Sequence, residues 1–382
     1  MVKTKNKKTV FVMMSGGVDS SVAALLLAKN KKYEVVGCFI KGYNIDGCQE
    51  ADSEDARRTA EFLKIPFYVI DLENEYKKLV VDYMIDGYRK GITPNPDVMC
   101  NREIKFGLFL KKALEMGAPT YRLPAGRHGQ AGIYVATGHY VRLRRITIGQ
   151  MSDVRCQMFA AKDGNKDQSY FLWTLTQKQL RHCLFPIGDY LKSEVREIAR
   201  KAGLPTAEKK DSQGICFLGM VKFKDFLRQY LPVKRGDVLN IEGKKIGEHD
   251  GVWFYTIGQR HIGISGKKPY YIAEKNIKKN ILTAAEGENN PVLYKKEIKL
   301  TDVNFLNPLI FNTKYSIPVM ARVRYRQPLA PAALINCRKL SVVSCKLIFD
   351  RPVKFVAAGQ SAVFYSAKSE MLGGGIIVNF DF

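Results

Sequence analysis

Residues 12–23, VMMSGGVDSSVA, join an apolar run to a helical pattern through the turn Ser-Gly-Gly. The run Thr9–Met14 predicts a first strand, and the Ala- and Leu-rich stretch Ser20–Asn30 predicts a helix. Glycines let a backbone approach a ligand with its amides turned inward, and the N-terminus of the following helix carries partial positive charge. The stretch therefore predicts a phosphate-binding loop, although it is neither a Walker A loop nor a G-x-G-x-x-G turn. A plain tight turn is the alternative, which a bare Gly-Gly would favour.

Strand-like and helix-like stretches alternate from this loop to about residue 215. Further strands are predicted over Tyr33–Ile40, Pro66–Asp71 and Tyr134–Gly138, and further helices over 52–65, Asn74–Lys90, Ile104–Met116 and 192–205, the last with Ser193 as N-cap. Such alternation predicts an α/β fold, a doubly wound parallel sheet with helices on both faces. We expect this domain to cover residues 1–215 and to bind a nucleotide at the carboxyl ends of its strands.

The pattern changes after about Phe217. One more helix is predicted within FKDFLRQYLP, 223–232, and short β-type runs broken by Gly, Asn and Pro follow it to the end of the chain. This composition predicts a small β-rich connector domain over 216–294 and a C-terminal β-barrel over 295–382.

The charge balance suggests a polyanionic partner. The 382 residues include 61 Lys and Arg against 37 Asp and Glu, a formal charge of +24. A general bias toward solubility is one explanation, but nucleic acid is the first candidate for so large a surplus. The apolar run near the N-terminus is too short for a signal sequence or a membrane span, so we expect a cytoplasmic protein with no membrane contact.

Two basic stretches, 121–134 and 142–157, show no apolar period and are interpreted as surface insertions. Contact with RNA is possible there, but a solvated loop is the simpler explanation for any one arginine.

The eight cysteines show no C-x-x-C spacing and no paired His/Cys spacing typical of zinc, so most are expected to be buried reduced thiols. Cys100, in TPNPDVMCNREIKFG, 93–107, is predicted to lie just before a helix, where Arg102 and Lys105 would lower its pKa. A buried cysteine at a helix start explains this segment equally well. Cys216, in DSQGICFLG, 211–219, is either a small buried hydrophobe or a reacting thiol on a loop.

Other segments contain weaker candidates for contact with a nucleotide or with RNA. Lys166, Asp167 and Gln168 open a polar run onto aromatics and are candidates for phosphate or base contacts, with Tyr170 or Phe171 stacking. A helix cap followed by core aromatics would be preferred for this segment alone. A histidine such as His139, in ATGHYVR, is more often structural than catalytic. Basic stretches with aromatics, YTIGQRHIGISG and RVRYRQPL, suit either surface strands or RNA contact.

Taken in order, these segments resemble those of the tRNA-specific 2-thiouridylases, a family of PP-loop ATP pyrophosphatases. The resemblance covers nearly the whole chain, through SGGVDSS, NPDVMCNREIKFG, ATGHY, NKDQSYFL, DSQGICFLG, YTIGQR, RYRQ and GQSAVFY with LGGG. It implies an enzyme that thiolates carbon 2 of the wobble uridine, position 34, of tRNA. The implied route is adenylation of the C2 carbonyl by ATP with Mg²⁺, then sulfur transfer from a cysteine persulfide.

The resemblance also assigns site residues. Asp19 matches the acidic residue near magnesium and the phosphates, Cys216 the persulfide carrier, and Cys100 its partner in a transient disulfide. No residue is assigned as a dedicated metal ligand. The implied ATP-binding positions are Met13, Met14, Ser15, Gly16, Gly17, Val18, Asp19, Ser20, Ile40 and Gly138. The implied tRNA-binding positions are Asn95, Pro96, Asp97, His139, Lys166, Asp167, Gln168, Arg324, Tyr325 and Gln360. A protein that donates persulfide sulfur is an expected partner, and the enzyme is expected to be a monomer.

The chain departs from the family pattern at a few positions. Met13 stands where glycine is frequent, Met371 where cysteine is frequent, and the insertions 121–133 and 143–157 exceed the usual length.

Two other classes of function remain open. Another adenylating PP-loop enzyme, such as an amidotransferase-type synthetase or a lysidine-forming ligase, needs no paired sulfur-handling cysteines, and an iron–sulfur thiolase would need C-x-x-C. A non-catalytic RNA-binding protein that holds ATP would tolerate loss of Asp19 and of both cysteines.

Overall fold

The computed structural model describes residues 7–45, 47–117, 132–148, 153–211, 221–307, 316–339 and 343–378. The chain forms two compact units. The first comprises residues up to Val80 together with Asp97–Met220, and the second comprises Val81–Pro96 together with the chain from Val221.

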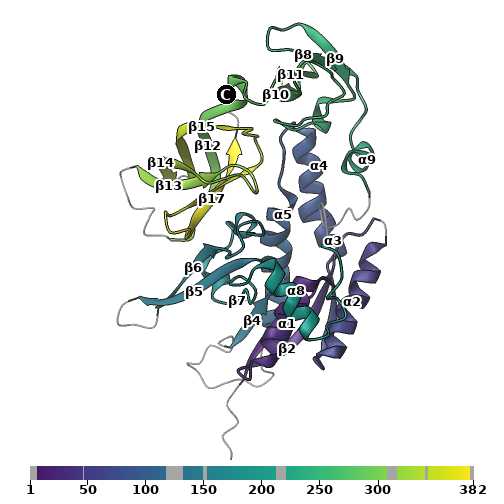
Figure 1. Cartoon of the computed structure of the whole chain (residues 1–382), viewed down its shortest axis with the longest axis vertical. Helices are drawn as coiled ribbons and strands as arrows, with labels where there is room; N and C mark the ends of the chain where they lie inside the picture. Colours follow the sequence, from purple (N-terminus) through teal and green to yellow (C-terminus); the bar gives the residue numbers. More distant parts are fainter. Residues whose placement is uncertain are drawn as a thin grey trace, which may run out of the picture. The chain divides into compact units, whose positions relative to one another are not determined.

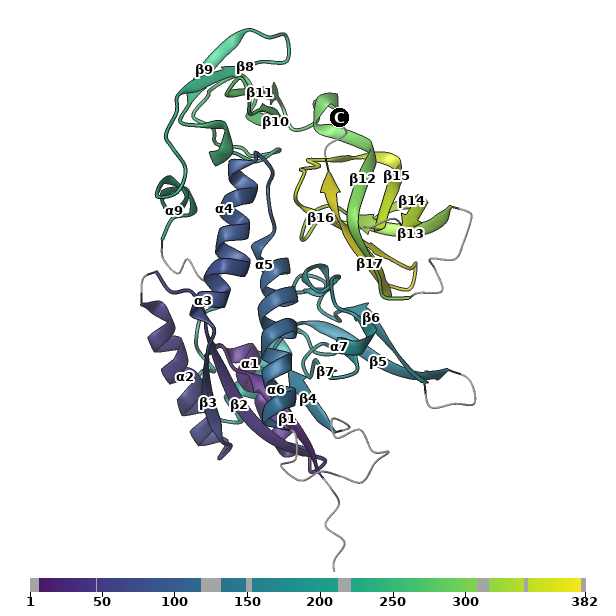
Figure 2. The same ribbon diagram turned by 180° about the vertical axis from the view of Figure 1, so that it is seen from behind.

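The first unit, in the purple to teal colours of Figure 1, is built on a five-stranded parallel sheet with the strand order β3-β2-β1-β4-β7; Figure 2 labels all five strands. Its strands are β1 (Lys8–Met13), β2 (Tyr33–Lys41), β3 (Phe67–Asp71), β4 (Ile133–Ala136) and β7 (Cys183–Leu184). The strand order reverses at β1, because the chain continues through β2 and β3 on one side and through β4 and β7 on the other. The carboxyl ends of β1 and β4 therefore form the topological switch point, where doubly wound sheets bind their ligands.

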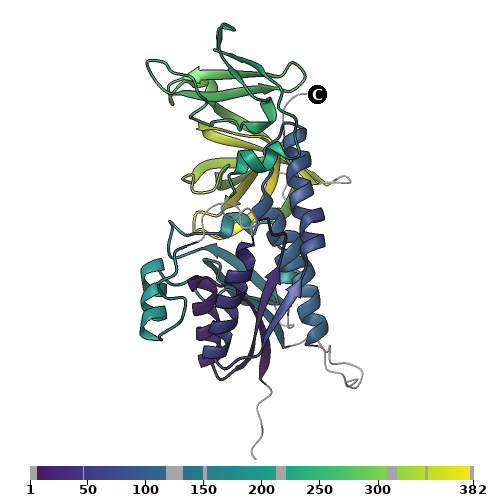
Figure 3. The ribbon, with the colours of Figure 1, turned by 90° about the vertical axis from the view of Figure 1, so that its right-hand side faces the viewer.

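Helices cover both faces of this sheet, as Figure 3 shows. Helices α1 (Val18–Lys29) and α2 (Cys48–Phe62) share one apolar core with the sheet, in which Ala24 and Ala56 meet Val10 and Val35. Helix α8 (Lys192–Lys201) packs on α1 through Val195 and Ala199. The shorter helical elements of this unit are α3 (Glu73–Tyr76), η1 (Lys77–Val81), η3 (Ser169–Phe171) and α7 (Gln177–Leu180). The predicted doubly wound α/β fold is confirmed.

Three predicted helix starts are wrong. The helix expected over 52–65 begins at Cys48, directly after Gly47. The helix expected from Ile104 begins at Pro96, and runs without a break through α5 (Pro96–Met99), the π-helical η2 (Cys100–Phe109) and α6 (Leu110–Met116). Proline is well suited to the first turn of a helix, so Pro96 is a helix start and not part of a turn. Helix α8 is capped at Leu191, whose backbone N–H donates to Glu194 at 2.6 Å, and not at Ser193.

The stretch 142–157, expected to be an irregular insertion, forms an antiparallel hairpin. Its strands are β5 (Val141–Ile148) and β6 (Asp153–Ala160). Buried Cys156 and Met158 alternate along β6 with more exposed side chains, a period of two that the basic composition obscured. The other insertion, 121–133, lies almost entirely outside the described residues.

The second unit contains a β-rich part and a closed barrel, as expected from the sequence. Its helical elements are α4 (Asp82–Arg89), α9 (Phe223–Arg228), η4 (Val252–Phe254) and η5 (Pro291–Leu293). The four-stranded sheet has the order β10-β11-β8-β9, formed by β8 (Gly236–Leu239), β9 (Lys245–His249), β10 (Tyr270–Asn276) and β11 (Ile281–Glu286).

The barrel closes in the order β12-β15-β14-β13-β16-β17 (Figure 2). Its strands are β12 (Tyr294–Phe305), β13 (Ile317–Arg322), β14 (Ala330–Lys339), β15 (Val343–Lys354), β16 (Ser361–Tyr365) and β17 (Met371–Val378). Side chains such as Leu334, Leu347 and Phe349 fill its core. Among the described residues, no helix is both long and apolar enough to cross a bilayer.

Candidate functional site

The loop Ser15–Gly17 connects β1 to α1 at the switch point of the sheet. Gly16 has φ +71°, and a Cβ at this position would lie 2.2 Å from the backbone oxygen of Asp52. Both conditions require glycine there. Ser20 Oγ accepts the backbone N–H of Ser15 at 3.1 Å and donates to the oxygen of Gly17 at 3.0 Å, which ties the loop to the first turn of α1. The loop therefore presents backbone at the positive end of a helix, the arrangement predicted for phosphate binding.

Gly138, which follows β4, brings a second loop against the same helix start. A Cβ on Gly138 would lie 2.6 Å from the backbone nitrogen of Ser20 and 2.7 Å from the carbonyl carbon of Asp19. Only glycine permits this approach, so the loops after β1 and β4 meet where a nucleotide would lie.

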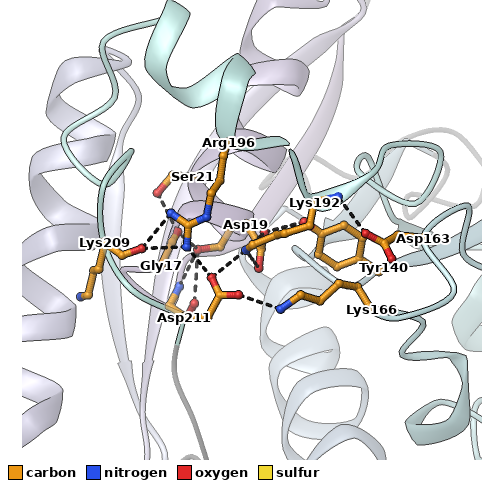
Figure 4. A network of polar contacts seen from close by, with 12 residues as sticks. Gly17, Asp19, Ser21, Tyr140, Asp163, Lys166, Lys192, Arg196, Lys209 and Asp211 are labelled. Carbon is orange, nitrogen blue, oxygen red and sulfur yellow. Dashed lines mark hydrogen bonds and ion pairs between the residues drawn. The ribbon is translucent and has the colours of Figure 1, made fainter. Parts of the chain in front are cut away.

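A network of charged side chains surrounds Asp19 (Figure 4). Lys192 Nζ lies 2.7 and 2.8 Å from the two carboxylate oxygens of Asp19, and the hydroxyl of Tyr140 donates to Oδ1 at 2.8 Å. The same ammonium lies 2.9 Å from Oδ1 of Asp211. The Lys192 side chain is 12% exposed, whereas the two carboxylate side chains are about one-third exposed, so the acids remain accessible to a ligand.

Asp211 binds two further cations. Lys166 Nζ lies 2.7 Å from its Oδ2, and Arg196 Nη2 lies 2.7 Å from its Oδ1. Burial alone would raise the pKa of Asp211, but the hydrogen bonds from Lys166 and Lys192 outweigh it and lower that pKa. The pKa of the Tyr140 hydroxyl is raised by burial and by the charge of Asp19, so Tyr140 stays a hydrogen-bond donor at neutral pH.

Cys100 lies inside the helical run and is buried, with 5% of its surface exposed. Burial raises the pKa of its thiol, and Lys105 and a hydrogen bond with Tyr76 offset this only in part. The expected lowering of its pKa is therefore wrong, because Cys100 lies within the helix and away from water, and because Arg102 pairs with Glu103 at 2.7 Å. Burial likewise raises the pKa of Asp97, one turn earlier.

Of the described cysteines, Cys38, Cys100, Cys156 and Cys183 are buried and free, as predicted for most of them. Cys345 on β15 is disulfide-bonded. Cys216 lies outside the described residues, so its predicted disulfide with Cys100 stays a prediction.

Comparison with known proteins gives the family. Three family models match: a tRNA methyl transferase HUP domain over residues 8–220, a tRNA methyl transferase PRC-barrel domain over 224–286 and an aminomethyltransferase beta-barrel domain over 295–377. The tRNA-specific 2-thiouridylase MnmA of Bacillus licheniformis is 44% identical over 386 residues, which cover 99% of this chain and 96% of the relative. The protein of the same name from Bacillus subtilis is 43% identical with the same coverage, and that from Staphylococcus epidermidis is 42% identical over 96% and 94%.

The chain belongs to the tRNA-specific 2-thiouridylase family. Membership in this family of enzymes confirms the resemblance drawn from the sequence, and it implies the use of ATP. Among solved structures, the U34-tRNA thiolase NcsA from Methanococcus maripaludis is 15% identical over 59% of this chain and 68% of its own, with a TM-score of 0.30. A likeness that weak carries no argument about function.

Three of the positions predicted to bind ATP, Met13, Met14 and Ile40, lie in strands of the sheet or next to one. Met13 and Met14 are buried, and Met14 belongs to the core between the sheet and its helices. Their part in ATP binding stays a prediction, and because the side chains are buried it would fall to the backbone. Ile40, near the end of β2, is half-buried and pairs in register with Ile70.

Among the positions assigned to tRNA, Lys166, Asp167 and Gln168 lie beside the Asp19 network. The buried carboxylate of Asp167 accepts N–H groups from Ala161 and Ser169. Gln168 Oε1 accepts the backbone N–H of Tyr140 at 3.0 Å and so supports the tyrosine that binds Asp19. These contacts connect the segment to the Asp19 network, while its tRNA contact stays a prediction.

His139 is buried, and its Nδ1 lies 2.8 Å from Thr137 Oγ1. Burial and the charge of Lys105 place its pKa well below the usual range, so the ring is neutral near pH 7.

In the second unit, the structure brings Gln360 onto the loop that leads to Asn95 and Pro96. Gln360 Nε2 donates to the backbone oxygen of Thr93 at 2.9 Å, and Thr93 N–H donates to the oxygen of Ala358 at 2.7 Å. Two segments more than 260 residues apart in the sequence are therefore hydrogen-bonded side by side, and Asn95 and Pro96 are buried there.

The side chain of Arg324 is held by backbone groups. Its Nε donates to the oxygen of Phe355 at 2.8 Å, and its Nη2 donates to that of Ile257. Tyr325 is half-buried, with the guanidinium carbon of Arg326 5.2 Å from the centre of its ring. Both remain candidates for tRNA contact.

Four residues of the site were not predicted from the sequence: Tyr140, Lys192, Arg196 and Asp211. Lys192 and Arg196 look like ordinary charges of an amphipathic helix, and only the packing of α8 on α1 brings them to Asp19 and Asp211. Tyr140 lies in the segment ATGHYVR and Asp211 begins DSQGICFLG, so two of the four residues belong to segments that the sequence had already singled out.

Proposed function

We propose that this protein is an ATP-dependent tRNA-uridine 2-sulfurtransferase that thiolates the wobble uridine, position 34. The observation that supports this most directly is the glycine-dependent cradle at the switch point, with Asp19 and its cations beside it, in a chain that aligns over its full length with 2-thiouridylases.

In the first step, the C2 carbonyl oxygen of the uracil attacks the α-phosphate of ATP and pyrophosphate leaves. An oxygen that leaves poorly becomes part of AMP, which leaves readily. The backbone of Ser15–Gly17 and the start of α1 would bind the phosphates, and Lys192, Lys166 and Arg196 would balance their charge.

The residues present fit a magnesium ion bound together with the nucleotide. Among the residues that the structure describes, no three His, Cys, Asp or Glu side chains are arranged to hold a metal ion by themselves. Mg²⁺ is commonly bound through one or two carboxylates plus substrate phosphates, which suits Asp19 with Asp211 nearby. When bound, the ion would neutralise phosphate charge during displacement.

In the second step, the terminal sulfur of a persulfide on Cys216 attacks C2 and AMP leaves. Cys100 then attacks Sγ of Cys216, which releases the thiocarbonyl and leaves a Cys100–Cys216 disulfide that a two-electron reductant must reopen. Alternatively, Cys100 attacks first and liberates the terminal sulfur as the nucleophile. Burial raises the pKa of Cys100, so its thiol is protonated at neutral pH. Because the thiolate is the nucleophile, the thiol must lose this proton before either attack.

Further parts of the proposal concern partners and organisation. A persulfide-carrying protein would supply the sulfur, and the enzyme would act as a monomer in the cytoplasm. We propose that residues 1–215 form the catalytic domain, 216–294 a connector and 295–382 the barrel that holds tRNA. Binding of tRNA should weaken steeply with salt, because a chain with charge +24 displaces counterions from the phosphates.

Mass analysis of nucleosides tests this function. The protein is incubated with unmodified tRNA, ATP, Mg²⁺ and a persulfide donor, and digested tRNA is examined for exchange of one uridine oxygen by sulfur. Wild type should form the thiolated nucleoside, and Cys100→Ala and Cys216→Ala should not. Cys156→Ala, which removes another buried free thiol, is the matched control and should remain active. Product formation by both site variants, or its absence with wild type, would refute the proposal.

A further inference from the structure

The ammonium group of Lys192 occupies both oxygens of Asp19. Its Nζ lies 2.7 Å from Oδ1 and 2.8 Å from Oδ2, and the Tyr140 hydroxyl donates to Oδ1 as well (Figure 4). The ring centre of Tyr140 lies 5.9 Å from the same Nζ. A cation is thus enclosed between Asp19, Tyr140 and Asp211.

The backbone that carries this lysine is held firmly. The N–H of Lys192 donates to Oδ2 of Asp163 at 2.9 Å, and α8 packs on α1 through Val195 and Ala199. Any change of partner by the ammonium must therefore come from rotation of its side chain, which has four flexible carbons.

A magnesium ion cannot share these positions with the ammonium. Mg²⁺ binds carboxylate oxygens at about 2.0–2.1 Å, and two cations on the same oxygens would repel each other. If Asp19 binds magnesium, Lys192 must give up at least one of its oxygens.

The neighbouring charged groups keep the free-energy cost small when the Lys192 ammonium leaves Asp19 and Asp211. Asp211 keeps Lys166 at 2.7 Å and Arg196 at 2.7 Å, so it is not left as an unpaired acid. Asp163 is held by the N–H groups of Lys192 and Asn165, which do not depend on the ammonium. The phosphates of a nucleotide on the adjacent loop would offer Lys192 new acceptors.

We propose that Lys192 is a positioning residue that exchanges partners. Before nucleotide binds, its ammonium stands in for the metal and holds Asp19 in place; when magnesium-ATP binds, the ion takes Asp19 and the ammonium transfers to the phosphates. This inference rests on the proposed function, because it takes Asp19 as the carboxylate that meets magnesium-ATP.

Electron paramagnetic resonance with Mn²⁺ as the probe tests the exchange without turnover. In nucleotide-free protein, Lys192→Met should bind Mn²⁺ about fivefold or more tightly than wild type, because the competing cation is gone. With a non-hydrolysable ATP analogue, the same variant should bind the Mn²⁺–nucleotide complex about tenfold more weakly, because a charged hydrogen bond to phosphate is lost. Opposite changes in the two measurements are not expected from structural damage.

Matched variants complete the test. Lys201→Met makes the same substitution on the same helix but removes a cation that pairs with Glu197, and should change nucleotide-free Mn²⁺ affinity less than about twofold. Lys192→Arg keeps the charge and should resemble wild type. Lys192→Gln, which keeps a polar side chain, replaces Lys192→Met if thermal unfolding shows that Met disrupts the fold.

Unchanged or weaker Mn²⁺ binding by nucleotide-free Lys192→Met and Lys192→Gln overturns the exchange. The proposed function is judged separately, by tRNA-dependent release of AMP by wild type. If wild type releases AMP and the Mn²⁺ prediction fails, only the inference about Lys192 is wrong. If wild type releases none, the function itself is wrong, whatever the metal affinities.

Discussion

Two helix starts, at Val18 and at Pro96, bring chemistry-bearing residues into contrasting surroundings. At α1, a glycine loop leads into a first turn where Asp19 is partly exposed and bound by Lys192 and Tyr140. At α5, a proline opens the helix, and Cys100 four residues later is buried with a raised pKa. The first site is ready to bind charge from solvent, whereas the second keeps its thiol protonated and protected.

The difference suggests how the two steps of the proposed reaction are kept apart. Nucleotide can bind and react where charges are already arranged, while the thiol contributes only when it is uncovered and loses its proton. A reactive thiolate exposed at all times would be open to oxidation.

The largest expected effect separates the two sites by function. Cys100→Ser should lower thiolation by roughly 10³-fold or more, because removing a nucleophile abolishes the step that needs it. The same variant should keep tRNA-dependent release of pyrophosphate, since it leaves the cradle intact. Loss of both activities together would show that the two helix starts do not act independently.

An intermediate effect tests the cradle. Gly16→Ala should weaken binding of an ATP analogue by about tenfold or more and should destabilise the first unit by about 1–3 kcal/mol, from backbone strain and contact with Asp52. Calorimetric titration and thermal unfolding would measure both.

Gly203→Ala is the matched control for this substitution. Gly203 has φ +67°, close to the +71° of Gly16, but its Cβ would meet no atom nearer than 3.9 Å. It should cost about 1–2 kcal/mol from the left-handed backbone alone and leave nucleotide binding unchanged. Equal effects of the two substitutions would mean that the contact with Asp52 does not matter.

The smallest expected effect concerns the thiol. Lys105→Met should raise the pKa of Cys100 further, because the nearby positive charge that favours the thiolate is removed. The thiolate of Cys100 would then form at higher pH, as measured by ultraviolet difference titration against the same protein with Cys100→Ser. Arg102→Gln, which removes a cation paired with Glu103, should leave the pKa of Cys100 unchanged. A downward shift in Lys105→Met would contradict this account of the site.

The sequence predicted the architecture well because local patterns dominate it. The run before Ser15, the helical pattern after it and the later alternation define a doubly wound sheet, and Gly16 proves necessary on two counts. The start at Pro96 was missed because the prolines and asparagines of 93–101 suit a turn as well as a helix start, and tertiary packing decided between them.

The candidate site was harder to predict, since its network depends on contacts between distant segments. Asp19 and Lys192 are 173 residues apart, and nothing near Lys192 distinguishes it from the other lysines of an amphipathic helix. The direction of the pKa shift at Cys100 was predicted wrongly for a related reason. Local sequence shows the charges nearby, but only the fold shows the burial that outweighs them.

Helix α4 has a consequence for synthesis of the protein. The segment Val81–Pro96 belongs to the second unit, but it is synthesised long before the rest of that unit. In the folded protein, the ring of Tyr88 packs against the ring of Phe223, with ring centres 5.3 Å apart. Ribosomes add about 5–20 residues per second, so roughly 130 residues of intervening chain delay this partner by about 6–25 seconds. During that interval the side chain of Tyr88, buried in the folded protein, lacks the ring of Phe223, so the packing of α4 is completed only after the whole first unit has been synthesised.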